Sequence, residues 1–408
     1  MALLIRNREA ALLFATLLLN MVGFGVVFPL LPLLVRDMGG SSLALGFMVT
    51  AWAAAQFAFS PVWGALSDRW GRRPALVLGV AGMGLTFILM AWAPSVAWLA
   101  AARLLGGIVS AATLPAAQAY LADVTAPHER GEAMTTVGAA FGIGFILGPA
   151  LGAVLAPIGV RGTFVVGAAI SGLNLLAVLA GLPEPHERNP DAGARSGRLR
   201  VGWREAWREP WAVYMYVVLL MAFSASSLFS MLGLYLLDRL SLDPARIGLA
   251  FVVQGAVSVT LQLFVVASAM RRLGYDPTLV LACGLGSAGF GVLAASHTVA
   301  SAFAGVALVA AGVSLVRPTA AAAVSLRAGL PQGAVMGAQT ALDALGRALG
   351  PLWAGLAYRW HPSLPFVSSA VIYALAGIMV GACRQAARHD RIRCEAVERE
   401  QEGGQARR

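Results

Sequence analysis

The chain contains no lysine and few charged residues of either sign. All 30 basic side chains are arginine, and with 20 acidic side chains the charged residues reach only 12% of the 408 positions. A soluble globular domain carries about 25% charged residues. Hydrophobic residues make up 58% of the sequence, and its mean hydropathy is +0.74. This balance excludes an ordinary soluble domain and indicates a membrane protein.

The sequence also lacks the patterns of disulfide frameworks, metal sites and common catalytic centres. Its three cysteines, Cys283, Cys383 and Cys394, have no CxxC spacing. The stretch 284–289 matches the GxGxxG fingerprint, but it lies in a continuous apolar run without a strand–turn–helix setting. No GxSxG elbow or phosphate-binding P-loop is present. We therefore expect no enzyme, no metal and no cofactor, with a proton gradient as the source of energy.

The apolar residues form long blocks, each of the length that crosses a bilayer. About 20 apolar residues in a helix span a hydrocarbon core of roughly 30 Å. Because lipid offers no hydrogen-bond partners, such blocks must be helices or barrel strands, and these are too long for barrel strands. The sequence predicts helical spans at about 10–34, 43–63, 74–93, 97–119, 133–156, 162–182, 211–236, 247–269, 277–296, 299–322, 333–357 and 364–383.

One hydrophilic break divides these spans into two groups of six. It is rich in proline, glycine and arginine. We predict an N-terminal bundle at 1–182, a cytoplasmic linker at 183–210, a C-terminal bundle at 211–384 and an Arg-rich cytoplasmic tail at 385–408. The expected fold class is an all-α polytopic membrane protein with two pseudo-symmetric six-helix bundles.

The arginines give the orientation of this topology. With both termini in the cytoplasm, 22 arginines fall in cytoplasmic segments, five outside and three within spans. The positive-inside rule predicts this asymmetry. Because the arginines are spread over many short loops and form no single patch, the net charge of +10 does not indicate nucleic-acid binding.

The loop between the second and third spans carries the most specific motif. It combines glycines, an aspartate and three arginines before Pro74, in an order that a plain basic loop would not require. It resembles the signature loop of the major facilitator superfamily, which implies the twelve-helix fold of that family. The resemblance implies a conformational gate formed by Gly64, Asp68, Arg69, Gly71, Arg72, Arg73 and, from the end of span 4, Asp123.

A second resemblance, in spans 4 and 5, is to the drug/proton antiporter branch, which includes tetracycline and multidrug efflux carriers. Span 4 carries Arg103 followed by a glycine pair. Span 5 carries a glycine–proline pattern typical of exporters in this superfamily: Gly144, Gly148, Pro149 and Gly152. Ordinary close packing of small residues between helices is the alternative explanation of the same glycines.

Four ionisable residues lie within predicted spans: Arg103, Arg317, Asp343 and Arg347. A charge at mid-bilayer costs about 2.5–3.5 kcal/mol on insertion scales, so each is a candidate for function. Asp343 and Arg347 are four residues apart and share a helix face. They form either a self-neutralising pair or a proton switch centred on Asp343. For Arg103 the resemblance implies a role in proton coupling, and hydrogen bonding to backbone carbonyls is the alternative.

Span 1 departs from the family that it resembles. Its sequence is similar to the first helix of the tetracycline/proton antiporters, which carry an aspartate at the position of Asn20. Asn20 can hydrogen-bond a substrate but cannot release a proton. Polar residues within spans need partners inside the bundle, and they either join helices or line a mainly neutral cavity. The candidates for the cavity are Asn20, Gln56, Gln118, Asn174, Gln254 and Gln339.

These features predict a secondary active transporter that exports small amphipathic molecules by proton antiport through alternating access. The alternative is a metabolite carrier or uniporter of the same superfamily, for a sugar or an amino acid. We expect a monomer in the bacterial inner membrane whose partners are a small-molecule substrate, protons and lipid.

Overall fold

The computed structural model describes residues 8–125, 130–184, 212–327 and 332–405, and in these ranges its secondary structure is entirely helical. The first half contains α2 (Arg8–Asp37), α3 (Ser42–Trp70), α4 (Arg72–Ala91), α5 (Val96–Ser110), α6 (Thr113–Val124), α7 (Arg130–Leu155), the 3-10 turn η1 (Ala156–Ile158) and α8 (Gly159–Gly181). The second half contains α11 (Ala212–Leu240), α12 (Pro244–Phe264), α13 (Val266–Leu273), α14 (Tyr275–Ala294), α15 (Val299–Arg327), α16 (Gln332–Trp360) and α17 (Leu364–Gln405). The prediction of an all-α membrane protein is confirmed.

Ten helical segments of the described part are long and apolar enough to cross a membrane. The α5–α6 pair forms one of them, from Val96 to Val124. α7 and α16, with 26 and 29 residues, have comparable lengths and pack against α2 and α3. The count of twelve spans stays a prediction, as do the domain boundaries, because most of the predicted linker at 183–210 lies outside the described residues.

The outer surface of the protein is suited to lipid. Many large apolar side chains are exposed on it, among them Phe47, Leu173, Leu176 and Ile378. Exposed tryptophans lie near helix ends, at Trp70, Trp92, Trp98 and Trp360. Such rings favour the interface between lipid and water, so their positions are consistent with the predicted membrane boundaries.

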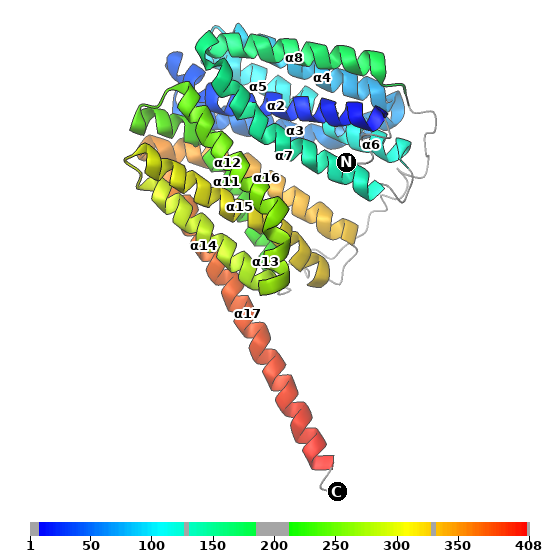
Figure 1. Cartoon of the computed structure of the whole chain (residues 1–408), viewed down its shortest axis with the longest axis vertical. Helices are drawn as coiled ribbons and strands as arrows, with labels where there is room; N and C mark the ends of the chain where they lie inside the picture. Colours follow the sequence, from blue (N-terminus) through cyan, green and yellow to red (C-terminus); the bar gives the residue numbers. More distant parts are fainter. Residues whose placement is uncertain (1–7, 126–129, 185–211, 328–331, 406–408) are drawn as a thin grey trace.

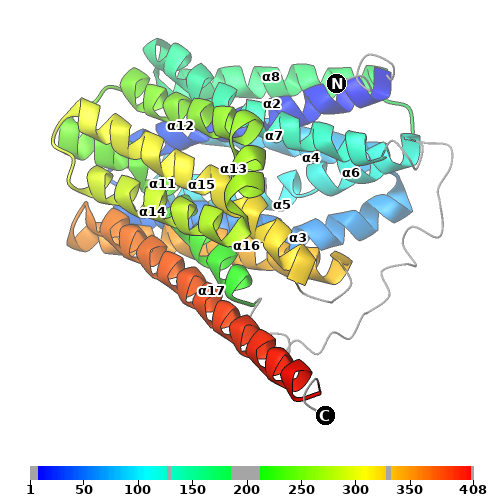
Figure 2. The ribbon, with the colours of Figure 1, turned by 60° about the horizontal axis from the view of Figure 1, so that its bottom comes forward.

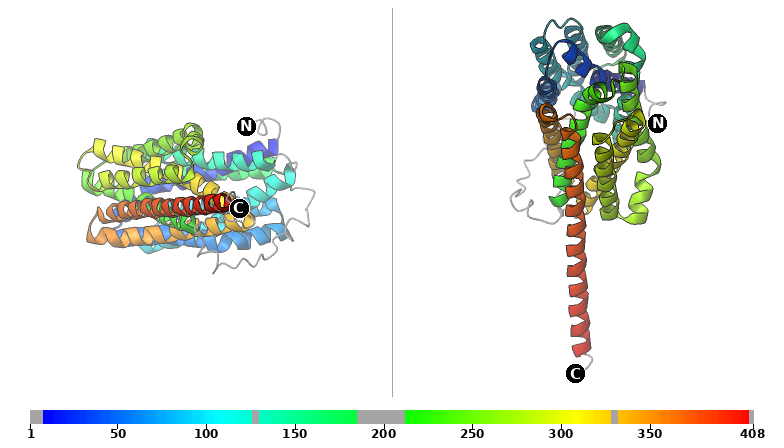
Figure 3. Two further views of the ribbon diagram at one scale, coloured as in Figure 1. Left: turned by 90° about the horizontal axis from the view of Figure 1, so that it is seen from below. Right: turned by 90° about the vertical axis from the view of Figure 1, so that its left-hand side faces the viewer.

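The helices run roughly along one common direction and form two groups (Figures 1 and 2). α2 to α8 pack mainly on one another, and so do α11 to α17. The 42 residues of α17 extend the helix well beyond the other helices, as the right view of Figure 3 shows. At about 1.5 Å per residue, this helix is longer than a bilayer core is thick.

Glycines bring helices close together inside each bundle. A Cβ atom built on Gly148 of α7 would lie only 2.6 Å from the Cα of Gly25 on α2. In the second half, a Cβ atom on Gly350 of α16 would lie 2.2 Å from the carbonyl oxygen of Phe223 on α11. Backbones can approach this closely only where side chains are absent. The first and fifth spans of each half therefore pack in the same way.

The two bundles meet through α3 and α16, through α7 and α12, and through α2 and α11. A Cβ atom on Gly46 of α3 would lie 2.2 Å from the carbonyl oxygen of Pro351 on α16. Nearby, the hydroxyl of Thr50 donates a hydrogen bond of 2.7 Å to the carbonyl of Ala348. These contacts lie toward the end where α2 finishes, which we call the latch end. The opposite end, with the loop at 64–74, is called the signature end.

We predict that Gly148→Ala lowers the thermal stability of the protein, because the new methyl group meets the backbone of α2. Overpacking of this kind costs about 1–3 kcal/mol. The measurement is the loss of monodisperse protein on heating, followed by fluorescence-detected size-exclusion chromatography in detergent.

Gly172→Ala on α8 is the matched control, because a Cβ atom there has no neighbour within 4 Å. Alanine is the better helix former, so this variant should be as stable as the wild type or more stable. Equal stability of the two variants would contradict close packing at Gly148.

Candidate functional site

The signature end holds an ion-pair cluster centred on Arg72. Its Nε donates to the Oδ2 of Asp123 across 3.1 Å, and its Nη1 contacts Asp68, which lies near the end of the preceding helix. Nη1 also donates to the hydroxyl of Ser67 at 2.9 Å. The cluster ties α4 to α3 and α6 within the first bundle. The structure thus brings together three of the predicted gate residues and adds Ser67.

Glu184 contacts the signature loop, and the sequence analysis missed it. Its two carboxylate oxygens accept the backbone N–H groups of Arg72 and Arg73 at 2.6 and 3.0 Å. Gly71, with φ at +114°, brings the chain into α4 without a side-chain cap, and a Cβ atom there would lie 2.5 Å from Glu184. A helix start without Ser, Thr, Asp or Asn needs an acceptor from elsewhere. The absence of a capping side chain at the start of α4 was the signal in the sequence that an acceptor such as Glu184 had to come from elsewhere.

The start of the predicted linker is consequently fixed to the loop that was predicted to form the gate. Besides the Glu184 contacts, the hydroxyl of Tyr120 donates to the carbonyl of Pro183 at 2.7 Å. The Arg73 guanidinium contacts the carbonyl of Leu179 on α8. Arg69 is exposed, and Gly64 faces α6, where a Cβ atom would lie 3.9 Å from Pro115.

The latch end holds an ion pair that joins the two bundles. Arg36, near the end of α2, places its Nη1 2.6 Å from the Oδ1 of Asp238, near the end of α11. The other carboxylate oxygen of Asp238 accepts the Tyr358 hydroxyl of α16 at 2.8 Å. We call these three residues the latch. No local pattern predicts this ion pair, since Arg36 and Asp238 lie 202 positions apart.

A row of aromatic rings crosses the interface between the bundles. Trp52 of α3 stacks on Phe24 of α2, with centroids 4.5 Å apart, and Phe24 meets Phe28 edge-on at 4.8 Å. Phe28 then contacts Phe229 of α11 at 5.3 Å, and Phe229 stacks on Phe251 of α12 at 6.2 Å. These five residues are called the aromatic row.

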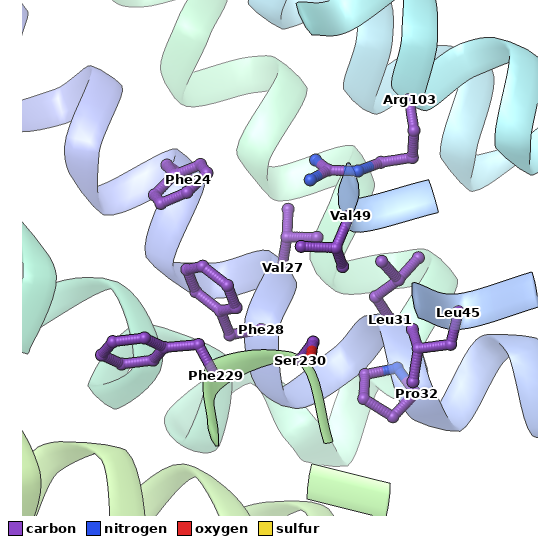
Figure 4. A pocket seen from close by; sticks show the side chains of 10 residues that line it. All are labelled: Phe24, Val27, Phe28, Leu31, Pro32, Leu45, Val49, Arg103, Phe229 and Ser230. Carbon is purple, nitrogen blue, oxygen red and sulfur yellow. The ribbon is translucent and has the colours of Figure 1, made fainter. Parts of the chain in front are cut away.

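A small pocket opens beside the aromatic row (Figure 4). Phe24, Phe28 and Phe229 line one part of it. Aliphatic side chains, the hydroxyl of Ser230 and the Arg103 guanidinium line the rest. The pocket lies between the bundles, so a ligand there would contact both halves. Its mainly apolar wall with a few polar groups has the usual composition of a small-molecule site, but its volume of about 10 Å³ in this conformation holds about one water molecule.

Arg103 lies in the first bundle, at the pocket. Its guanidinium carbon is 5.2 Å from the centroid of the Trp52 ring, and the residue is only 4% exposed. Among the described residues, its buried Nε has no hydrogen-bond partner. The structure therefore shows no hydrogen bond from this Nε to a backbone carbonyl, which was the alternative role for Arg103.

The other three ionisable residues form a cluster in the second bundle. Asp343 contacts Arg347 one turn along α16, and its Oδ2 lies 3.6 Å from Arg317 of α15. The Asp343 side chain is 12% exposed, whereas those of Arg317 and Arg347 are 71% and 47% exposed. The shared helix face of Asp343 and Arg347 was predicted from their spacing. The contact from Arg317 was not predicted.

The polar cavity candidates are dispersed. Asn174 donates to the carbonyl of Thr16 on α2 at 3.4 Å, a helix-to-helix contact inside the first bundle. Asn20, Gln254 and Gln339 are buried. Buried amide atoms of Gln254 and Gln339 have no hydrogen-bond partner in the described part. Gln56 is half-buried and Gln118 is exposed. None of the six lines the pocket at the aromatic row.

The glycines of the predicted antiporter motif lie along the contact between α7 and α2. Cβ atoms on Gly144 and Gly152 would lie 2.4 Å from the Cβ of Met21 and 3.3 Å from Pro29. Pro149 lies against Gly25 of α2. The motif therefore has a packing role, and this geometry does not determine a direction of transport.

We predict that Asp238→Asn makes the latch end open more often. The Arg36–Asp238 pair is partly exposed, so its loss is worth about 0.2–1 kcal/mol, which corresponds to a population shift of up to about fivefold. Opening can be followed by placing a cysteine at Ser230, which is buried in the pocket, in a chain whose three native cysteines are replaced by alanine. The rate of maleimide labelling should rise about two- to fivefold.

Asp243→Asn is the control for this variant. Asp243 lies near the same end but caps its own helix, accepting the N–H of Arg246 at 2.7 Å, and asparagine caps equally well. An unchanged labelling rate in Asp238→Asn, or an equal rise in both variants, would exclude a latch between the bundles.

Comparison with known proteins agrees with this architecture. The family model described as Major Facilitator Superfamily matches residues 13–351. The chain is 31% identical over 381 residues to the class C tetracycline resistance protein of Escherichia coli, covering 90% of this chain and 95% of that one. It is 27% identical over 371 residues to multidrug resistance protein 2 of Bacillus subtilis, with coverage of 88% and 91%.

A solved structure shares the fold. It is a bacterial homolog of the human lysosomal transporter Spinster, captured in an inward-facing and unoccupied conformation. It superposes with a TM-score of 0.73 at 16% identity, over 93% of this chain and 97% of that chain. A family match over most of the length, helices that can cross a membrane and a solved structure with the same fold lead to one conclusion: this chain is a multi-pass membrane transporter that belongs to the major facilitator superfamily.

Proposed function

We propose that the protein exports small amphipathic molecules in exchange for protons. The observation that carries this proposal is the pocket beside the aromatic row, which lies between the two bundles and offers ring faces to a ligand. Relatives named as multidrug and tetracycline resistance proteins align over nearly the whole chain and support it.

Alternating access follows from how the bundles meet. In this conformation the latch and the α3–α16 contact hold the bundles together at the latch end. Outward release of a substrate requires that these contacts break while the bundles close at the signature end. Because the substrate pocket lies between the bundles, rocking of one bundle on the other exposes it to each side in turn.

Asp343 is the proton-coupling group in this proposal, with Arg347 and Arg317 as its partners. Within the apolar helical segments of the described part, it is the one carboxylate that lies far from a helix end. The two guanidinium groups stabilise its ionised form. Protonation of Asp343 would remove its attraction to both arginines. The equilibrium between two arrangements of α15 and α16 would then shift toward the one in which Asp343 is neutral.

Arg103 was predicted to take part in proton coupling with Asp343 and Arg347. It lies in the other bundle, on α5, and its role in coupling would be to sense the substrate at the pocket. Binding of a substrate beside Arg103 and protonation of Asp343 would then each favour one of the two conformations.

One observation favours a second candidate function. Asn20 cannot carry the proton that an aspartate carries at this position in the tetracycline/proton antiporters. A carrier without a proton site here would work as a uniporter for a neutral metabolite such as a sugar or an amino acid. Substrate counterflow in liposomes without a pH gradient, unaffected by an imposed gradient, would identify this function.

The setting proposed for the exporter is the bacterial inner membrane, with both termini in the cytoplasm. It would act as a monomer, without nucleic acid or a bound cofactor, and the proton gradient would drive it. A screen in an efflux-deficient host, comparing accumulation with and without an uncoupler, tests export itself. Export that continues undiminished in the presence of the uncoupler would contradict proton antiport.

We predict that Asp343→Asn abolishes proton-driven transport, lowering uptake into everted vesicles at least about tenfold, because an amide cannot exchange a proton. Substrate-for-substrate counterflow should persist, since it needs the two conformations but no net proton movement.

Asp37→Asn is the control, because Asp37 is an exposed acid at the end of α2. It should transport as the wild type does. Full proton drive in Asp343→Asn vesicles with equal amounts of protein would remove Asp343 from the coupling mechanism.

A further inference from the structure

Arg103 is a buried cation for which the described residues supply no counter-charge. Its side chain reaches the pocket wall, and the residue is 4% exposed. Its Nε is buried without a hydrogen-bond partner in the described part of the chain, and no carboxylate of that part forms an ion pair with it. The one described contact of its guanidinium is the Trp52 ring. A ring face compensates only part of the desolvation of a cation.

The distribution of acids leaves this charge unbalanced. In the described segments, Asp68, Asp123 and Asp238 lie near helix ends, where they pair with arginines of the signature cluster and the latch. Asp343 is already in contact with two arginines. Toward its middle the protein therefore presents excess positive charge, and Arg103 is the part of that charge that faces the pocket.

The pocket places an unpaired guanidinium beside ring faces. Figure 4 shows Arg103 extending over the pocket from one side, with Phe24 and Phe28 on another wall and Phe229 facing them from α11. A guanidinium offers several donors in a planar fork that matches a carboxylate or a sulfonate. The rings beside it offer an apolar surface for a flat hydrocarbon body.

We propose that this pocket recognises an amphipathic organic anion, an aryl or alkyl body that carries one acidic group. The acid accepts hydrogen bonds from Arg103, and the apolar body packs on the aromatic row. The inference deepens the proposed export function and rests on it, since it names the charge of the exported substrate. Phe28 and Phe229 are in contact here, so the body enters as the bundles part and these rings separate.

Three probes of nearly equal shape test this inference: naphthalene-2-carboxylate, its methyl ester and the 2-naphthylmethylammonium cation. Their equilibrium binding to the full chain in nanodiscs is measured by isothermal titration calorimetry, without any gradient. We expect the carboxylate to bind at least about tenfold more tightly than the other two, as charge-assisted hydrogen bonds predict. Arg103→Gln should remove this preference while the ester binds as before.

A second variant, which retains Arg103, tests the same inference in case Arg103→Gln does not fold. Val49 also lines the pocket, and Val49→Asp supplies an internal carboxylate to the guanidinium, so it should weaken binding of the carboxylate at least about tenfold and leave the ester unchanged. Arg359→Gln, at an exposed arginine near the end of α16, is the matched control and should retain the preference.

Equal affinity of the wild type for all three probes would overturn the proposal, and so would a preference that survives both pocket variants. Either result would leave proton-driven export of neutral compounds untouched, because that function is tested by the uncoupler in cells. Conversely, a carboxylate preference that is lost in Arg103→Gln would stand even if export proved independent of protons.

Discussion

The pairing of charges inside an apolar bilayer is the constraint on which the other functional features depend. A charge there is stable only when an opposite charge, a ring face or water accompanies it. Asp343 lies between Arg347 and Arg317, so its charge is matched twice over. Among the described residues, Arg103 is accompanied by the ring of Trp52 and by no opposite charge. The paired Asp343 suits the proposed exchange of partners on protonation, whereas Arg103 suits the proposed binding of an anionic ligand.

The contacts that hold the helices together divide into rigid and exchangeable ones. Inside the bundles, glycines such as Gly148 bring backbones into direct contact, and water cannot replace such packing without loss. Between the bundles, the Thr50 hydroxyl bond and the partly exposed Arg36–Asp238 pair are polar contacts that water can replace at little free-energy cost. The bundles also meet through the ring contact of Phe28 with Phe229 and the close approach of Gly46 to Pro351, and these contacts must separate as well if the bundles part.

The sequence predicted what depends on local spacing. Long apolar runs predicted where most helices begin, although α3 and α17 continue well past the predicted ends, and the four-residue spacing of Asp343 and Arg347 predicted that they share a helix face. The latch could not be predicted, because it joins residues that only the folded helices bring together. The ring of Trp52 beneath Arg103 and the Glu184 cap of α4 likewise depend on how distant helices pack. Periodicity within one helix carries no information about these contacts.

The proposed preference for an anion explains both the neutral side chain at Asn20 and the positive charge of Arg103 at the pocket. Asn20 lies four residues before Phe24 and so shares its helix face, one turn from a ring of the pocket. An aspartate at this position would add a negative charge to α2, the helix that lines the pocket with Phe24 and Phe28, whereas asparagine adds none. The membrane potential then acts in favour of export, since it is negative inside and is worth about 2.3 kcal/mol per charge at 100 mV. A cationic substrate would have to leave against that potential, but an anion leaves with it. A neutral side chain at Asn20 therefore agrees with the proposed export of anions, in which Asp343 is the group proposed to couple transport to the gradient.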